Sequence, residues 1–204
     1  MKISKTNHKR QEIKFKINSR EMQKFTRHYS LRSLFPDRVI ESIYFDTADL
    51  KFFRLSEEGI TPRLKIRVRG YNDGDLNNLE IKKTNNHHRE KVVFKNFKFD
   101  NFKLHESLKK IGIMNAVDQK LRVKYLRSYY ELNGLGRITL DRNIEFFHPN
   151  KNYHNSIRIN DYVLEVKIDS NQFDKNKVEK LINFKESRFS KYCVGINCLF
   201  WFNL

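Results

Sequence analysis

The sequence has few of the features that mark metal-binding, secreted or membrane-spanning proteins. Only two of its 204 residues are cysteine, and the spacing of Cys193 and Cys198 fits neither a redox CxxC pair nor a zinc-binding pair. The stretch MKISKTNHKRQEIKF lacks the apolar segment of a secretory signal. The longest apolar run, CVGINCLFWFNL, is shorter than the roughly 20 residues that cross a bilayer. We therefore expect a cytoplasmic protein.

Internal repeats, low-complexity segments and recognisable linkers are also missing. A chain of 204 residues without such divisions is expected to form one domain with a sizeable core. The seven histidines share no metal-ligand spacing. The sequence contains no RNP1 string, zinc-finger spacing or KH-type GxxG loop, so nucleic acid is not an expected partner.

Positive charge is the feature that the sequence has in excess. Lys and Arg number 41 against 24 Asp and Glu, which gives a net charge of +17 and a pI near 9.9. This balance implies an anionic partner. Charge alone does not distinguish between nucleic acid, an anionic membrane and a small polyanion. The chain also carries 17 Phe and 9 Tyr, so we expect it to fold and not to form a disordered basic tail.

Hydrophobic periodicity predicts an α+β fold in which short helices lie between strands. The capping residues Asn18 or Ser19, with Glu21 in the first turn, predict a helix that runs to about Leu34. Further helices are expected at 47–59, 101–112 and 174–184, and near the C-terminus. Eight strands suit an antiparallel β-barrel with helices packed outside, whose interior holds side chains and one small ligand. The strands are predicted at 10–17, 38–46, 63–71, 79–83, 89–97, 120–132, 137–147 and 161–169.

The stretch RLKIRVRG alternates cations with aliphatic residues. Because strand side chains alternate between faces, Arg63, Lys65, Arg67 and Arg69 share one face. Such a face lies against water in most one-sided sheets. Two observations favour an inward face: the amphipathic helices need an apolar surface to cover, and a merely solvated face usually mixes the signs of its charges. Unpaired buried cations are costly, so an inward face requires that a polyanion or water fills the space, and we expect phosphates.

Eight motifs in order resemble the VTC domain, the polyphosphate polymerase branch of the triphosphate tunnel metalloenzymes, which are CYTH-like proteins. They are RQEIKF, ESIYFDTADLKFF, KIRVRGY, LEIKK, YLRSYY, RITLDRNI, LEVK and SKY, and they extend from Arg10 to Tyr192. The resemblance implies that residues 1–204 form one triphosphate tunnel domain. In that family a barrel with basic walls binds a nucleoside triphosphate, a growing polyphosphate chain and a divalent metal.

The resemblance also assigns roles to individual residues. It implies Glu165 as the main ligand of Mn²⁺ or Mg²⁺, with Glu12 and Glu80 as further metal candidates and Asp141 as a weaker acidic one. The catalytic cations would be Arg67, Arg69, Lys167 and Lys191. The phosphate-binding residues would be Lys14, Lys65, Lys82, Arg127, Arg137 and Ser190.

The implied activity is transfer of the γ-phosphoryl group from ATP, or another nucleoside triphosphate, to inorganic polyphosphate. Two alternatives stay open, a CYTH-type triphosphatase and a non-catalytic polyphosphate sensor. CYTH-type triphosphatases begin with E-x-E-x-K, whereas this chain has Arg10 at the first position, so one carboxylate fewer favours the polymerase branch. Eukaryotic polymerases carry a regulatory domain and membrane helices, and we expect neither in this chain, so a membrane-protein partner is the expected route to any membrane. The oligomeric state is left open.

Overall fold

The structure, a computed structural model, describes residues 2–7, 10–29, 31–86, 88–132, 136–149, 156–169 and 174–201. Within these ranges the chain forms ten strands and five helices. The strands are β1 (Lys2–Asn7), β2 (Arg10–Ile17), β3 (Arg32–Asp46), β4 (Arg63–Tyr71), β5 (Asn78–Asn85), β6 (His88–Lys95), β7 (Asp118–Leu132), β8 (Gly136–Phe147), β9 (Ser156–Ile159) and β10 (Tyr162–Asp169). The helices are α1 (Ser19–His28), α2 (Lys51–Glu58), α3 (Asn101–Lys109), α4 (Lys175–Ile182) and α5 (Lys191–Trp201).

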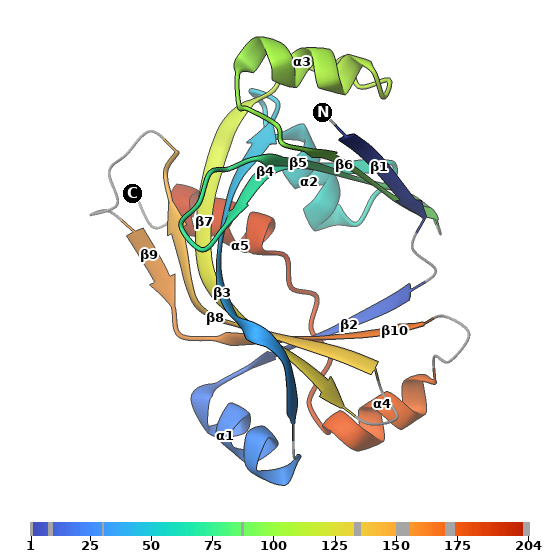
Figure 1. Ribbon diagram of the computed structural model, residues 1–204, viewed down its shortest axis with the longest axis vertical. Coiled ribbons are helices and arrows are strands. Elements are labelled where there is room, and N and C mark those ends of the chain that lie inside the picture. Colours follow the sequence, from blue (N-terminus) through green and yellow to red (C-terminus); the bar gives the residue numbers. More distant parts are fainter. Residues whose placement is uncertain are drawn as a thin grey trace.

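All ten strands belong to one antiparallel sheet. Its order is β1-β6-β5-β4-β3-β7-β8-β10-β2, with β9 paired to β8 beside this path. The sheet curves round until its two halves face one another (Figure 1). The prediction of an eight-stranded barrel is wrong in two respects. There are ten strands, and among the described residues no pairing joins the edge strands β1 and β2, so the sheet is not closed.

Helices cover the convex side of both halves of the sheet. In Figure 1, α3 lies outside β4, β5 and β6, whereas α1 and α4 lie outside the half that contains β2, β8 and β10. The contacts agree, since Leu104 and Leu108 of α3 join a core cluster with Ile66 and Ile81. None of the described helices has the length and apolarity needed to cross a membrane.

The first helix is shorter than the sequence predicted. Asn18 caps it as expected and forms a capping box with Glu21, but α1 ends at His28 and β3 already begins at Arg32. The prediction of a helix to Leu34 is therefore wrong. Pro36 disfavours helix at the residue before it, and pairing of β3 with β7 along most of its length stabilises the extended form instead.

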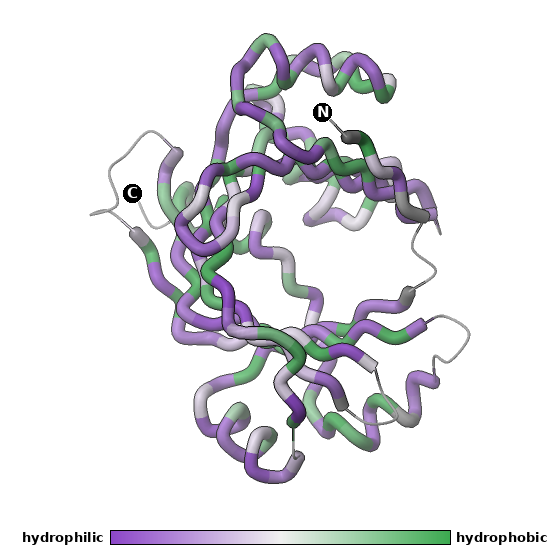
Figure 2. Tube along the Cα trace, in the orientation of Figure 1, coloured by the Kyte–Doolittle hydropathy of each residue, from purple (hydrophilic) through white to green (hydrophobic). Residues whose placement is uncertain are grey.

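The strand alternation predicted from RLKIRVRG has the inward orientation. Ile66 and Val68 are buried in the cluster beneath α3, while Lys65 and Arg67 line a cavity on the concave side. Figure 2 shows hydrophilic and hydrophobic positions alternating along the strands. Each buried aliphatic side chain contributes about 1.5–3 kcal/mol, so the apolar convex face fixes which residues point inward.

The C-terminal helix α5 packs closely on β7 and β8. A Cβ atom at Gly195 would lie 2.6 Å from side-chain carbons of both Leu121 and Phe146, so only glycine permits this approach. Asp46 fixes the same region, because its carboxylate accepts hydrogen bonds from the backbone N–H groups of Phe52 and Phe53 and from the Tyr192 hydroxyl. The start of α5 is therefore held against the sheet, and Lys191 at that start reaches the cavity.

Candidate functional site

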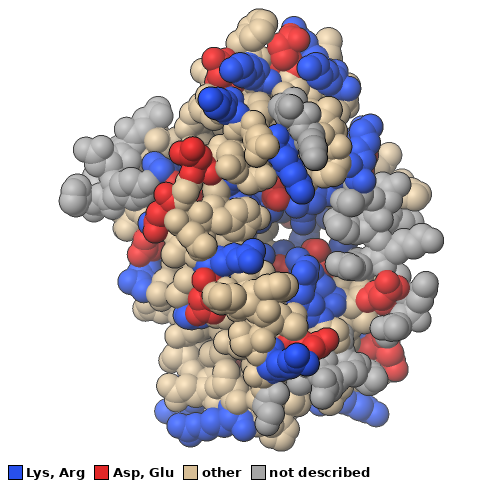
Figure 3. All heavy atoms as spheres, in the orientation of Figure 1, with Lys and Arg blue, Asp and Glu red and all other residues tan. Residues whose placement is uncertain are grey.

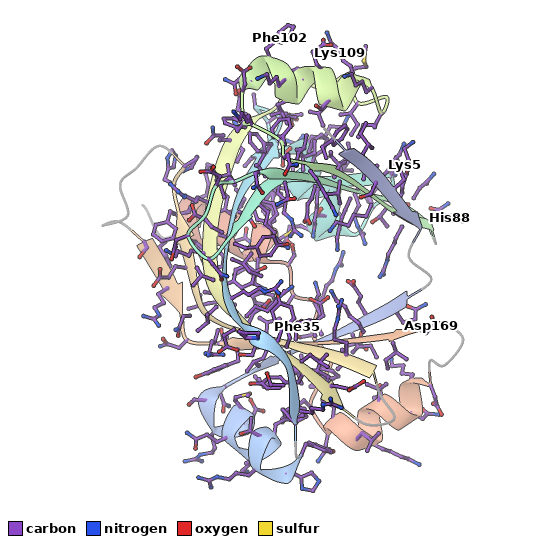
Figure 4. All side chains as sticks on the ribbon, in the orientation of Figure 1. Lys5, Phe35, His88, Phe102, Lys109 and Asp169 are labelled. Carbon is purple, nitrogen blue, oxygen red and sulfur yellow. The ribbon has the colours of Figure 1, made fainter. Side chains whose placement is uncertain are left out.

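The concave side of the sheet encloses a cavity of about 1040 Å³. Figure 3 shows Lys and Arg side chains around the hollow on this face, and in Figure 4 side chains from both halves of the sheet point into the space between them. Among the described residues, thirteen Lys and Arg but only five Glu side chains line the cavity. The residues assigned as catalytic, phosphate-binding or metal-binding are all in this lining: Glu12, Lys14, Lys65, Arg67, Arg69, Glu80, Lys82, Arg127, Arg137, Glu165, Lys167, Ser190 and Lys191. Asp141, the weaker acidic candidate, is not in it.

Arg67 is held by a carboxylate from the neighbouring strand. Its Nε donates to Glu80 Oε2 at 2.7 Å and its Nη1 donates to the Tyr44 hydroxyl at 3.1 Å. Lys91 Nζ donates to the other Glu80 oxygen at 2.6 Å, and Arg69 Nη1 lies 3.7 Å from Oε2. Burial opposes ionisation of Glu80, but these cations outweigh it and keep the pKa of Glu80 well below its ordinary value. Glu80 is thus surrounded by cations, which suits a counter-ion better than a metal ligand.

Two tyrosines continue this network at the wall of the cavity. Arg69 is 6 % exposed and donates to the hydroxyls of Ser42 and Tyr125, at 3.0 and 3.1 Å. Burial alone would raise the pKa of the Tyr44 phenol, but the charges of Arg67 and Arg69 outweigh burial and lower it to about 8. Both guanidinium groups are therefore fixed in orientation, and each retains further N–H donors for a ligand.

A second carboxylate holds two cations on the other side of the cavity. Asp141 is fully buried and accepts from Arg127 Nε at 2.5 Å and Nη2 at 2.7 Å. Lys191 Nζ donates to the same carboxylate and lies 4.5 Å from the centre of the Tyr125 ring. Burial opposes the charge of Asp141, but Lys191 and Arg127 prevail and lower its pKa. Asp141 therefore acts as a counter-ion that joins β8 to α5.

Glu165 and Lys167 lie side by side on β10. Lys167 Nζ is 3.1 Å from Glu165 Oε1 and 3.7 Å from Glu12 Oε1. Pairing of β10 with β2 places Glu165 opposite Lys14, whose Nζ donates to the Phe189 carbonyl at 3.0 Å. Burial opposes the charge of Glu165, but Lys167 and Lys14 more than compensate and keep its pKa well below the ordinary value. Glu165 is thus a carboxylate that stays charged.

Polar groups of three residues on the concave side of the sheet, Lys82, Arg137 and Thr139, lack an ion-pair or hydrogen-bond partner among the described residues. Lys82 forms no ion pair with a described carboxylate, and burial lowers its pKa to about 8. On β8, the buried Arg137 Nε and Thr139 Oγ1 have no hydrogen-bond partner within the described structure. Pairing places Thr139 opposite Glu165, and Arg137 opposite Lys167. Buried polar groups are normally satisfied, so these atoms indicate that a polar ligand belongs here.

The donor set around Glu165 fits a hard divalent cation that is shared with a phosphate ligand. Among the described residues, no group of three or more His, Cys, Asp or Glu side chains is arranged to hold a metal. The histidines His8, His87 and His154 lie outside the described residues. Mg²⁺ and Mn²⁺, however, often bind through one or two carboxylates plus substrate phosphates and water. Glu165 and Glu12, joined through Lys167, offer two such carboxylates. Arg10 replaces an acid of the triphosphatase pattern, and its side chain is not among those that the structure describes.

Some residues of the cavity were not assigned from the sequence. Lys91 and Arg89 follow the same alternation on β6 as the cations of β4, so the period-two signal was present there. Tyr44 and Tyr125 lie in two of the motifs that resemble the VTC family, ESIYFDTADLKFF and YLRSYY. A tyrosine in a strand, however, is most often part of the hydrophobic core. Arg188 precedes α5 in a segment without regular periodicity, and no signal in the sequence marks it.

Several solved structures have a similar fold. The Hippeastrum protein HpAC1, described as having a dominant triphosphatase activity, matches with a TM-score of 0.55 and 15% identity, over 90% of this chain and 94% of that one. The PH1819 protein of Pyrococcus horikoshii gives 0.53 and 16%, over 90% and 95%. A Vibrio parahaemolyticus protein named a 'putative adenylate cyclase' gives 0.52 and 13%, over 93% and 99%. No curated protein gave a significant match.

At these identities the likeness defines the class of fold, a curved antiparallel sheet around a central cavity. The family follows from the sequence itself. The VTC domain matches residues 9–200, nearly the whole chain, and this protein belongs to that family. The resemblance inferred from the eight motifs is confirmed.

Proposed function

We propose that this chain is a single polyphosphate polymerase domain, which transfers the γ-phosphoryl group of ATP to the end of a polyphosphate chain inside the cavity. The observation that carries the proposal is a cavity of about 1040 Å³ lined by thirteen cations, which come from strands of both halves of the sheet, from α5 and from the segment just before α5. A linear polyanion is the ligand whose charge and shape such a lining matches. Nucleic acid is not part of the proposal, because these cations face inward.

The reaction needs no nucleophile from the protein. An oxygen of the terminal phosphate of the polyphosphate attacks the γ-phosphorus of ATP. The bond between the γ-phosphorus and the oxygen that bridges to the β-phosphate breaks, and ADP leaves. Catalysis of this kind consists of positioning and of stabilising negative charge. Arg67, Arg69, Lys167 and Lys191 would place and stabilise the transferred group.

The other assigned cations would hold the flanking phosphates. Arg127 and Arg137 grip phosphate oxygens through planar forks, whereas Lys14, Lys65 and Lys82 supply point charges, and the Ser190 hydroxyl donates a hydrogen bond. Glu165 and Glu12 would hold Mn²⁺ or Mg²⁺, which neutralises charge on the phosphates when bound. Glu80, committed to Arg67 and Lys91, would position Arg67.

A triphosphatase is the second candidate, because a protein of similar fold, HpAC1, is described as having that activity. Both candidates use the same phosphate grip and differ in the acceptor, which is water in one case and polyphosphate in the other. A protein that binds polyphosphate without turnover would be a sensor on the same scaffold.

One experiment separates the three. Purified protein is incubated with ATP and Mn²⁺, with Glu165→Gln as the inactive control, and the products are analysed for long acid-labile polyphosphate and for inorganic phosphate. Polymer with matching ADP supports the proposal. Phosphate release without polymer would replace it with a triphosphatase. Binding of tripolyphosphate without any turnover would leave a sensor, and absence of binding would reject all three.

A further inference from the structure

Three arginines stand together at one end of the cavity, outside the set that the family motifs assign. Arg63 is the first residue of β4, Arg89 lies near the start of β6, and Arg188 lies just before α5. Arg63 pairs with Thr84 of β5, and Thr84 pairs with Arg89, so the two flanking arginines lie at the same level of the sheet. All three line the cavity, yet Arg89 and Arg188 are exposed, which places them at an opening. We call these three residues the mouth triad.

The mouth triad lacks the counter-ions that accompany the inner cations. Within the described structure none of the three forms an ion pair, and Arg188 Nη2 donates instead to the neutral Ser56 carbonyl at 3.0 Å. The two nearby glutamates of the lining have other partners. Glu57 accepts from Asn197 Nδ2 at 3.4 Å, and Glu186 pairs with Lys175 at 3.5 Å. Burial, followed by repulsion from Arg188 and Arg89, lowers the pKa of Arg63. Positive charge therefore accumulates here without compensation.

An unpartnered hydroxyl lies in the same wall. Ser56 lines the cavity and is 7 % exposed, and its Oγ has no hydrogen-bond partner within the described residues. The carbonyl of this residue is the one that holds Arg188. Gly59, one turn further on, leaves room for that guanidinium, since a Cβ atom there would lie 2.9 Å from Arg188 Nη2. Three arginines and a buried hydroxyl donor together form a place for an anion.

The mouth triad continues the inner row of cations and is not a separate patch. Arg63, Lys65, Arg67 and Arg69 alternate along one face of β4, and at about 3.4 Å per residue their Cα atoms extend over roughly 20 Å. Lys65, between the mouth and the inner cations, donates to the Ser190 hydroxyl at 2.8 Å. A triphosphate bound at Arg67 and Arg69 would end before the mouth, whereas a longer linear polyphosphate would reach it.

We propose that Arg63, Arg89 and Arg188, with the Ser56 hydroxyl, form a subsite for the phosphates of a polyphosphate chain beyond the first three, so that the protein distinguishes long polyphosphate from triphosphate. This proposal rests on the proposed function, since it needs the inner cations to hold one end of the same polyanion. It adds a determinant of chain length at the mouth of the cavity.

The test compares two ligands and two triple variants. Arg63→Gln/Arg89→Gln/Arg188→Gln removes the mouth triad. Arg20→Gln/Lys24→Gln/Arg27→Gln removes the same charge from the exposed side of α1, on the convex face. Affinities for inorganic tripolyphosphate and for long-chain polyphosphate are measured by calorimetry at matched ionic strength. A long chain can bind in many registers, so each variant is compared with the parent protein for the same ligand.

The mouth variant is expected to lose about tenfold or more in affinity for long polyphosphate and to change less than about twofold for tripolyphosphate. Its affinity for the long chain should also depend less steeply on salt, because fewer counterions are released. The α1 variant should retain both affinities. Equal weakening for both ligands, or an unchanged affinity for the long chain, would overturn the inference. If the triple variant does not fold, the exposed Arg89→Gln change carries the same test with a smaller expected loss.

Failure of the proposed function has a different signature. A parent protein that binds neither ligand would refute the cavity as a phosphate site. A parent protein that binds tripolyphosphate tightly, with a mouth variant indistinguishable from it on both ligands, would refute only the mouth subsite.

Discussion

Replacing Glu165 with glutamine separates a metal ligand from a structural counter-ion. Glu165 is 7 % exposed and lies 3.1 Å from Lys167, with Lys14, Arg127 and Lys82 close enough to hold its pKa well below the ordinary value. Glutamine keeps the shape of the side chain and removes its charge. The surrounding cations would then have one buried carboxylate fewer to offset their repulsion.

The magnitude follows from that burial. Breaking a buried ion pair by removing one partner costs about 3–5 kcal/mol. For a chain of this size each kcal/mol shifts the melting temperature by about 2–4 °C, so the ligand-free variant should melt roughly 6–20 °C lower. Tripolyphosphate supplies the missing negative charge, so it should stabilise the variant more than it stabilises the parent protein.

Binding in the presence and absence of metal tests the ligand role. In EDTA, Glu165→Gln should bind tripolyphosphate at least as tightly as the parent, because a negative charge has left a polyanion site. With Mn²⁺ only the parent should gain affinity, and turnover by the variant should be lost. Lys167→Ala, the matched control, should weaken binding in both conditions. If Glu165→Gln weakens binding equally with Mn²⁺ and with EDTA, Glu165 is not the metal ligand.

Three further perturbations follow from the contacts of the cavity. Arg67→Ala should weaken tripolyphosphate binding by about 10- to 150-fold, because charged hydrogen bonds contribute about 1.5–3 kcal/mol; unchanged calorimetric affinity would remove Arg67 from the site. Glu80→Gln should lower the melting temperature of the free protein, with partial recovery on adding tripolyphosphate, whereas metal-dependent binding should survive; loss of the Mn²⁺ effect would make Glu80 a metal ligand after all. Above pH 8, affinity should fall by up to about tenfold per pH unit for each group, since Lys82 (pKa about 8) loses its positive charge and Tyr44 (pKa about 8) gains a negative one. Lys82→Arg and Tyr44→Phe should each make the loss of affinity with pH less steep. If the pH profiles of both variants match that of the parent protein, the loss comes from titration of the ligand.

The sequence alone was sufficient to predict that the cations of β4 face the cavity. The alternation in RLKIRVRG, combined with helices that need an apolar surface, predicts inward cations, and the structure has Ile66 and Val68 beneath α3. The two strands that were missed carry weak signals. β1 (KISKTN) is mostly polar, and β9 (SIRI) has only four residues. Whether the sheet closes depends on contacts between residues far apart in the chain, and no local pattern encodes that.

The partners of the charged residues were harder to predict than their positions. Glu80 was assigned to a metal because LEIK resembles a family motif, yet cross-strand register places it opposite Arg67 on one side and within reach of Lys91 on the other. Asp141 likewise acquires Lys191 from α5, fifty residues further along. Such pairs depend on strand register and on helix docking, which no single segment determines.

These pairs divide the cavity cations into two groups with different consequences for a phosphate ligand. Arg67, Arg127 and Lys191 each hold a buried carboxylate, so their positions are fixed before any ligand arrives, and part of their charge is already neutralised. Lys82 and Arg137 have no such partner within the described residues, and neither does the mouth triad. The net attraction for a polyanion must therefore come mainly from the second group, whereas the first supplies the fixed geometry that phosphoryl transfer requires. A neutral substitution in the second group should act chiefly on affinity and its salt dependence, whereas one in the first group should lower turnover as well as affinity.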